Sequence, residues 1–155
     1  PEAVRWVTDS LTIVQDLRWV SFEPWPASVL AEAALAGGGA GPASPADPER
    51  CFALSCQLDD PCWEGGSGRV LALHHARRGD DEPALRWIAE ARTRCIRKPD
   101  TWAGLLGAIL LTEAELRAAV GDVGGAEAAS RDLVALAARA HLDGLLPGGL
   151  AILSR

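Results

Sequence analysis

Small residues recur along this chain at a spacing of about 40 residues, and this period restricts the fold more than any other feature of the sequence. Three glycines mark it, 41 and 42 residues apart: Gly38, Gly79 and Gly121. An alanine lies seven residues before each glycine and another lies five residues after it, at Ala31, Ala72, Ala114, Ala43, Ala84 and Ala126. A period of this length, built around a turn, indicates an array of stacked helical hairpins. We therefore expect an all-α superhelix of antiparallel helix pairs.

The composition agrees with a helical chain. Apolar residues make up 48% of the sequence, mostly as Ala and Leu, whereas aromatic residues make up only 5%. Ala and Leu are among the best helix formers, and strands prefer β-branched and aromatic residues. A length of 155 residues suits one domain, so residues 1–155 are expected to form a single helical-repeat domain. Because the chain has no Met and opens inside a helical pattern, we interpret it as a fragment of a larger protein.

The apolar spacing and the turn residues together predict seven to eight helices. They are expected at about 2–19, 26–36, 47–58, 61–78, 81–98, 101–120 and 124–140, with a weaker one at about 142–154 that Pro147 interrupts. Residues 37–48 hold four glycines and three prolines, which predicts an irregular linker where the other repeats have a tight turn.

Each recurring residue has an expected structural role. Alanines let two helices of a hairpin approach closely. The glycine after a first helix adopts a left-handed backbone conformation at little cost, and the aspartate beside it, Asp80 or Asp122, caps the next helix. Trp25, Trp63 and Trp102 lie near the starts of successive first helices, so we expect them to bury large areas between neighbouring hairpins.

The first helices of the hairpins are expected to line the concave face of the array. When the repeats are aligned on their three turn glycines, six residues are expected to point to this face: Ser28, Glu32, Arg69, Leu73, Leu111 and Glu115. This mixture of charged and apolar side chains suits a groove for a peptide or a small ligand. A merely solvated groove is an equal expectation.

Other residue types that could do chemistry have simpler interpretations. His74 and His75 are adjacent on a helix and diverge by about 100°, which favours packing over binding one metal ion. The acidic group Asp59, Asp60 and Glu64 precedes or opens a helix, where negative charge is stabilising, so we expect capping rather than acid–base catalysis. The glycine-rich run around Ser67 lacks the strand that a phosphate loop or nucleophile elbow needs. It predicts a close approach of two helices or a kink, with ligand contact as the less favoured alternative.

The four cysteines form no CxxC pair, which favours reduced and buried thiols over a labile disulfide or a zinc site. They are Cys51, Cys56, Cys62 and Cys95.

The net charge of −6 and a pI near 5.0 argue against direct binding of nucleic acid. A local run of Arg92, Arg94, Arg97 and Lys98 is interpreted as a solvated helix end. No signal peptide or membrane-spanning run is visible in the sequence, so we expect a cytoplasmic protein that does not contact membranes.

The second hairpin carries the pattern Trp…Ala…Gly-Asp-x-x-x-Ala-Leu-x-x-Ile-x-x-Ala, with Gly79-Asp80, Ala84-Leu85, Ile88 and Ala91. This pattern resembles the tetratricopeptide repeat. The longer period is similar to the C-terminal arrays of large ATP-dependent LuxR-type transcription regulators of high-GC bacteria. The stretches that carry this likeness are Asp60-Pro61-Cys62-Trp63-Glu64-Gly65, Arg77-Arg78-Gly79-Asp80, residues 91–97 and Pro99-Asp100-Thr101.

The resemblance covers about residues 20–140 and implies a right-handed superhelix. In that family the array follows a nucleotide-binding switch ATPase and senses an inducer or a protein. This chain contains no GxxxxGK[ST] loop and no DNA-reading helix-turn-helix pattern. Any ATPase or DNA-binding activity is therefore expected in other parts of such a regulator.

The sequence thus favours a non-catalytic module without a cofactor that binds a protein segment or a small effector. One alternative is a structural spacer that self-associates into homo-oligomers. A less favoured alternative is a metal-dependent enzyme that uses His74 and His75 together with Cys62 and the nearby acids.

Overall fold

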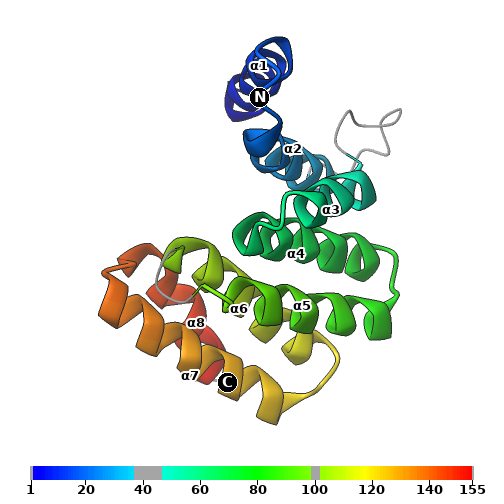
Figure 1. Ribbon diagram of the computed structural model, residues 1–155. Coiled ribbons are helices and arrows are strands. Elements are labelled where there is room, and N and C mark those ends of the chain that lie inside the picture. The colour runs from blue at the N-terminus through cyan, green and yellow to red at the C-terminus, as the bar shows by residue number, and fades with distance from the viewer. Residues whose placement is uncertain (1, 37–46, 99–101, 155) are drawn as a thin grey trace.

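The computed structural model describes residues 2–36, 47–98 and 102–154, which form eight α-helices and no strand (Figure 1). Consecutive helices pack in antiparallel fashion. The expectation of an all-α chain with seven to eight helices is therefore confirmed. The helices are α1 Glu2–Asp16, α2 Pro24–Ala36, α3 Pro48–Gln57, α4 Pro61–Arg77, α5 Asp81–Cys95, α6 Ala103–Ala119, α7 Val123–Ala140 and α8 Leu146–Leu153, with short 3-10 turns η1 Val20–Phe22 and η2 Asp143–Leu145.

The helices are arranged in two layers. In the first layer α2 packs against α4, α4 against α6, and α6 against α8. The helices α3, α5 and α7 alternate with these on the other side, and within the described residues their backbones do not approach one another. The stack can be followed from α1 at one end to α7 and α8 at the other (Figure 1). The helices α2, α4, α6 and α8 therefore form a continuous layer, and this layer positions the candidate site.

Aspartate and proline together start two of the helices. Asp47 accepts a hydrogen bond from the Glu49 N–H at 3.1 Å, and Pro48 occupies the first turn of α3. Asp60 accepts from the N–H groups of Cys62 and Trp63 at 2.9 and 3.2 Å, and Pro61 opens α4. Both prolines lie where a missing N–H leaves no hydrogen bond unmade.

The turn glycines have the predicted conformation, but only one of the two neighbouring aspartates caps a helix. Gly79 and Gly121 have φ of +79° and +81°. Asp122 accepts a hydrogen bond from the Gly125 N–H at 2.9 Å, and this bond, with the Arg117 guanidinium, holds the pKa of Asp122 below its ordinary value. The expectation for Asp80 was wrong, because its carboxylate instead contacts His75 and Arg78 at 3.4 and 3.2 Å.

The repeat alanines that the structure describes are buried. Ala72 and Ala114 are fully buried, and Ala31, Ala84 and Ala126 are at most 3% exposed. Gly38 and Ala43, together with most of the predicted linker, lie outside the described residues.

The glycines of α4 make room for α5. A Cβ atom added at Gly65 would lie 2.8 Å from the Cys95 Cβ, and one at Gly68 would lie 3.2 Å from the Ala91 Cβ. Carbon atoms in contact prefer about 3.5–4.0 Å, so larger residues would push the two helices apart. This close approach explains why a helix contains glycines that weaken it intrinsically.

Two prolines lie differently from the sequence prediction. The second helix begins at Pro24 rather than Pro26, so both prolines lie in its first turn. Pro147 does not interrupt the last helix but lies in its first turn, directly after η2. In both places a proline that suggested a break instead begins a helix. No helix among the described residues has both the length and the apolar character that a membrane span requires.

Candidate functional site

An open pocket of about 380 Å³ lies on the layer formed by α2, α4 and α6. Four of the six residues predicted for the concave face line it, namely Glu32, Arg69, Leu73 and Glu115. Each of the three helices contributes at least one of them. The alignment of the repeats on their turn glycines therefore identified four residues that lie together in one pocket.

Arg69 lines this pocket and links the three helices. Its Nη1 and Nη2 atoms donate to both carboxylate oxygens of Glu32 on α2 at 2.7 and 2.8 Å, and its Nε donates to the Thr112 hydroxyl on α6 at 2.8 Å. The Arg69 side chain is only 16% exposed. A bidentate pair of this kind fixes the planar guanidinium in one orientation. The charge of Arg69 is therefore balanced by Glu32 within the pocket.

The rest of the pocket is amphipathic. Leu35, Leu73 and Ala76 supply its apolar surface. Arg77 and Glu115 also line the pocket, and both side chains are exposed. Neither forms an ion pair within the part of the chain that the structure describes. A ligand in the pocket would therefore meet an apolar floor flanked by one available cation and one available anion.

Two predicted groove residues lie elsewhere. Leu111 is covered by α8, since a Cβ at Gly148 would lie 2.8 Å from the Leu111 Cδ1, and Leu111 packs against the core residues Leu110, Leu133 and Leu136. Ser28 is half-buried and does not line the pocket. The prediction failed for Leu111 because it treated the C-terminal segment as a weak helix, whereas α8 packs against α6.

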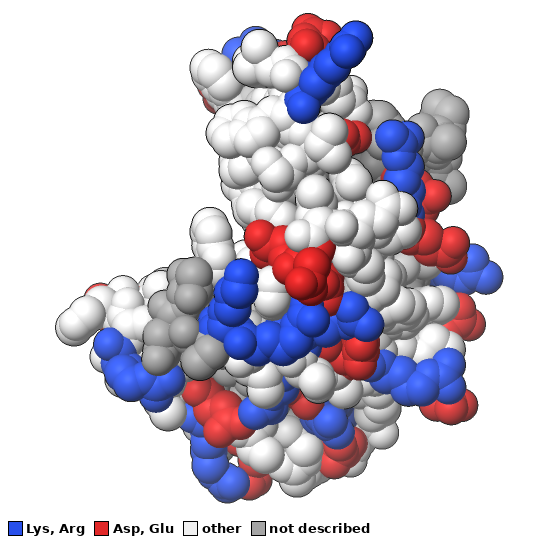
Figure 2. Space-filling model, viewed as in Figure 1, with Lys and Arg blue, Asp and Glu red and all other residues white. Residues whose placement is uncertain are grey.

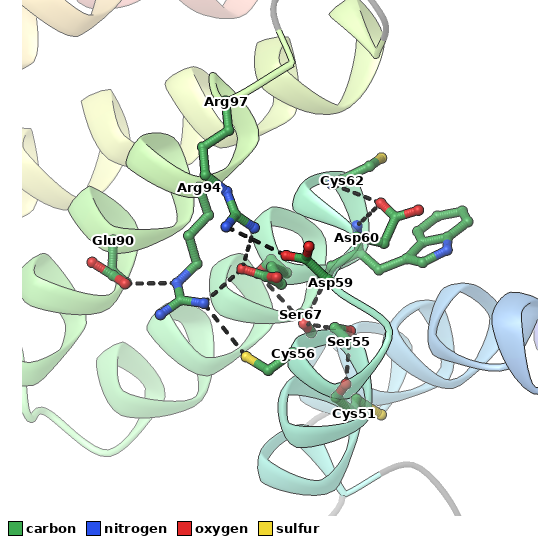
Figure 3. A network of polar contacts seen from close by, with 12 residues as sticks. Cys51, Ser55, Cys56, Asp59, Asp60, Cys62, Ser67, Glu90, Arg94 and Arg97 are labelled. Atoms are coloured by element: carbon green, nitrogen blue, oxygen red, sulfur yellow. Dashed lines mark hydrogen bonds and ion pairs between the residues drawn. The ribbon is translucent and has the colours of Figure 1, made fainter.

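A polar cluster joins α4 to α5, as Figure 3 shows. The Glu64 side chain is 2% exposed, and it pairs with Arg94 Nη1 at 2.6 Å and with Arg97 Nη2 at 2.7 Å. Arg94 also donates from Nε to Glu90 at 2.6 Å and from Nη1 to the Cys56 sulfur at 3.4 Å. The expected capping role of Glu64 was therefore wrong, because the side chain points into the α4–α5 contact instead of toward the start of its own helix.

A similar arrangement joins α5, α6 and α7. Glu113 is 4% exposed and pairs with Arg92 at 3.1 Å and with Arg117 at 2.9 Å, while Arg92 also reaches Asp132 at 2.5 Å. The prediction of a solvated arginine run was thus wrong for Arg92 and Arg94, whose charges are shared with acids on other helices, whereas Arg97 is exposed and also pairs with Glu64. In the space-filling view, basic and acidic side chains lie against one another over this part of the surface (Figure 2). In such pairs the basic partner offsets the cost of removing the acid from water.

The histidines and Ser67 have structural partners. The rings of His74 and His75 meet edge to face at 5.9 Å, and His75 Nδ1 lies 3.4 Å from the Asp80 carboxylate. Ser67 is fully buried, and its hydroxyl donates to the Trp63 carbonyl at 2.6 Å and contacts Ser55 Oγ at 3.2 Å. Over residues 2–36, 47–98 and 102–154, no group of three or more His, Cys, Asp or Glu side chains is placed to hold a metal ion.

The described cysteines are free, and none is an activated thiol. Burial raises the pKa of Cys51 and of Cys95 to about 11 and that of Cys62 to about 12. Cys56 is exposed, but partial desolvation also raises its pKa, and this effect outweighs the guanidinium of Arg94. A nucleophilic cysteine needs a lowered pKa, so these residues do not support thiol catalysis.

No protein-family model matches the chain, and no curated protein is significantly similar to it. The likeness to the arrays of LuxR-type regulators therefore depends on the repeat residues alone.

The repeat tryptophans form an exposed aromatic row that sequence analysis missed. Trp63 contacts Trp102 at a ring distance of 5.6 Å and Phe22 at 5.9 Å, and Phe22 in turn stacks on Trp19 and Trp25. Trp25 is 43% and Trp102 49% exposed, so these two rings bury less area between hairpins than expected. The row lies where α2, α4 and α6 begin, and its two connecting rings, Phe22 and Trp63, are half-buried. The recurrence of tryptophan at helix starts was the available signal.

Proposed function

We propose that this chain is a non-catalytic binding module, a right-handed superhelix of the tetratricopeptide type, that takes an extended protein segment or a small effector into the pocket on its concave face. The observation that carries this proposal is the Arg69 arrangement. One side chain is fixed by partners on two other helices beneath an open, partly apolar pocket. Preorganised polar groups within an apolar lining are typical of ligand sites.

The pocket favours a ligand with both charged and apolar parts. Its volume of about 380 Å³ lies within the usual range for small-ligand pockets, roughly 300–1,000 Å³. The apolar floor formed by Leu35, Leu73 and Ala76 would take an aliphatic or aromatic group. Arg77 and Glu115 would hold groups of opposite charge at its rim. A short peptide segment or a zwitterionic effector has this chemistry.

The setting that we propose is a bacterial transcriptional or signalling regulator. Support comes from the resemblance of residues 20–140 to the arrays of LuxR-type regulators and from the confirmed all-α architecture of paired helices. In such a protein, ligand occupancy of this module would influence the parts to which it is joined. The module itself would need no cofactor and would not bind nucleic acid.

The proposal is tested with a displayed library of random peptides and a thermal-shift screen of metabolites. Ligands selected on the unaltered protein are re-measured with Leu73→Glu, which adds a charge to the floor of the pocket. Val123→Glu, at an exposed position at the start of α7, is the matched control. We expect Leu73→Glu to weaken binding at least about tenfold, or roughly 1.4 kcal/mol, and the control to leave it unchanged. Screens that yield no ligand, or ligands that bind both variants equally, would contradict the proposal.

Self-association is the second candidate, because of the aromatic row. Trp19, Trp25 and Trp102 are each more than 40% exposed and lie in one contiguous set. Exposed apolar patches on soluble proteins commonly mark contact surfaces. Light scattering over a range of concentrations, repeated with Trp25→Ser, tests this function. If the measured mass remains that of a single chain at high protein concentration, self-association is ruled out as the function.

A further inference from the structure

The pocket on α2, α4 and α6 carries two charges of opposite sign that are not paired with each other. Arg77 and Glu115 both line it and are exposed, and neither has an ion-pair partner among the residues that the structure describes. The other two charged residues of the lining, Glu32 and Arg69, pair with each other at 2.7 Å. An occupant of the pocket therefore meets one cation and one anion that are available to it.

These two charges lie on different helices and at different heights. Arg77 is the last residue of α4, whereas Glu115 lies four residues before Ala119, the last residue of α6. Four residues are about one helical turn, or roughly 6 Å along the axis. Because α4 packs against α6 and packed helices have axes about 8–10 Å apart, the backbones at Arg77 and Glu115 are roughly 10–12 Å from each other. In a free amino acid a single carbon atom separates the two charges, so a ligand that pairs with both residues needs charges placed much farther apart.

An extended peptide supplies charges at such a separation. Its residues advance by about 3.3 Å each and alternate between two sides, so that residues i, i+2 and i+4 face the same side. An acidic residue at i and a basic residue at i+4 are therefore about 13 Å apart. The residue at i+2 lies between them on the same side, where it can pack on the apolar lining formed by Leu35, Leu73 and Ala76.

Arg69 offers hydrogen-bond donors that suit a peptide backbone. A guanidinium has five N–H groups. Three of those of Arg69 donate to Thr112 and Glu32, so two have no acceptor in residues 2–36, 47–98 and 102–154. Because Glu32 already balances the charge of Arg69 and would repel a second carboxylate beside it, these donors favour a neutral acceptor such as a peptide carbonyl.

We propose that the occupant of this pocket is an extended peptide segment in which an apolar residue stands between an acidic and a basic residue, each two positions away. The acidic residue pairs with Arg77, the basic residue pairs with Glu115, and the apolar side chain packs on Leu73. This inference rests on the proposed function, and it selects a protein segment over a small effector. Because exposed ion pairs are individually weak, the preference for this charge pattern should be moderate and should shrink as salt is added.

Three labelled synthetic peptides test the proposal by fluorescence anisotropy with the full chain. They differ only in the two charged positions of a central Glu-Ser-Leu-Ser-Lys motif, which the second peptide replaces by two Glu and the third by two Lys. We expect the mixed peptide to bind the unaltered protein at least about threefold more tightly than either of the others at low salt. Raising the salt concentration should narrow this difference.

Two charge reversals locate the pairing. Arg77→Glu leaves two acids at the pocket, so this variant should bind the peptide with two Lys most tightly. Glu115→Lys leaves two cations there, so it should bind the peptide with two Glu most tightly. Arg139→Glu makes the same change at an exposed position of α7, outside the pocket, and should keep the preference for the mixed peptide. All three positions are exposed, so the variants should fold, which circular dichroism checks.

Three results would overturn the inference, and they differ in what they mean for the proposed function. Equal binding of the three peptides that Leu73→Glu still abolishes would show that the pocket binds peptides without reading their charges. Binding of a metabolite in the pocket, with no binding of any of the three peptides, would make the occupant a small effector. Peptide binding that Leu73→Glu leaves unchanged would contradict the pocket itself as the binding site.

Discussion

The carboxylate of Glu64 accepts a hydrogen bond from Arg94 Nη1 at 2.6 Å, although the Glu64 side chain is only 2% exposed. A second arginine, Arg97, completes the pairing from the turn that follows α5. Removing a carboxylate from water is costly unless its partners are fixed and well aligned. The contact between α4 and α5 therefore depends on this charged cluster as well as on the close approach at Gly65 and Gly68.

Removal of the Glu64 carboxylate should destabilise the protein. In Glu64→Ala we expect a loss of about 1–2 kcal/mol in the free energy of unfolding, because the partly exposed Arg94 and Arg97 each lose a charge-assisted hydrogen bond to a buried carboxylate. The control is Glu127→Ala, which breaks an exposed pair with Arg131 and should cost no more than about 0.5 kcal/mol. Urea unfolding followed by circular dichroism gives both values. An equal loss in the free energy of unfolding for both variants would show that Glu64 is not paired with Arg94 and Arg97 in solution.

Two neighbouring glycines of α4 should respond oppositely to alanine. A Cβ at Gly65 would lie 2.8 Å from the Cys95 Cβ and 3.1 Å from the Ala91 carbonyl oxygen, so Gly65→Ala should destabilise the fold by about 1–3 kcal/mol. A Cβ at Gly66 would meet only Leu105 at 3.5 Å, which is ordinary contact. Gly66→Ala should therefore stabilise the protein by up to about 1 kcal/mol through helix propensity. Thermal unfolding of both variants measures the difference, and a shift of the same sign in both would refute the packing argument.

Stability should fall in alkaline solution because of the buried thiols. Burial raises the pKa of Cys62 to about 12 and those of Cys51 and Cys95 to about 11, whereas the unfolded thiols titrate near their ordinary value of about 9. Above that value the unfolded chain loses protons that the folded chain retains, so the free energy of unfolding decreases as the pH rises from about 9 toward 12. The decrease is measured by urea unfolding at several pH values. Cys56→Ser, at the exposed cysteine, should leave it nearly unchanged, and a flat profile would contradict the assigned burial.

The fold could be predicted to this extent because its signals are local. Gly79 and Gly121 end helices through their own backbone conformation, and Asp60 and Pro61 begin one through contacts within a few residues. Such signals are readable from neighbouring positions in the sequence. The helix bounds consequently differ from the predicted ones by a few residues.

The errors concern contacts between distant residues. Glu64 and Arg94 are 30 positions apart, and their pairing depends on how closely α4 and α5 approach, which no local pattern states. Leu111 has the phase of a groove residue, but α8 covers it. The recurrence of Trp25 and Trp102 showed where the repeats begin but gave no information on whether another layer covers their rings.

The pairing of Glu32 with Arg69 should be measurable as a coupling energy across the pocket. In a double-mutant cycle of Glu32→Gln and Arg69→Gln, we expect a coupling of about 1 kcal/mol, at the upper end for a partly exposed pair, because both carboxylate oxygens are engaged. The matched cycle of Glu127→Gln and Arg131→Gln, in which one contact joins two exposed side chains, should give less than about 0.5 kcal/mol. Urea unfolding of the single and double variants supplies both coupling energies.

A coupling near zero for Glu32 and Arg69 would show that α2 does not fix the guanidinium in solution. The pocket would then have to order Arg69 when a ligand binds, and this ordering would reduce the affinity. A coupling of the expected size, together with a loss of ligand affinity in Glu32→Gln that leaves the helical content unchanged, would indicate that Glu32 acts by orienting Arg69 rather than by holding α2 in place.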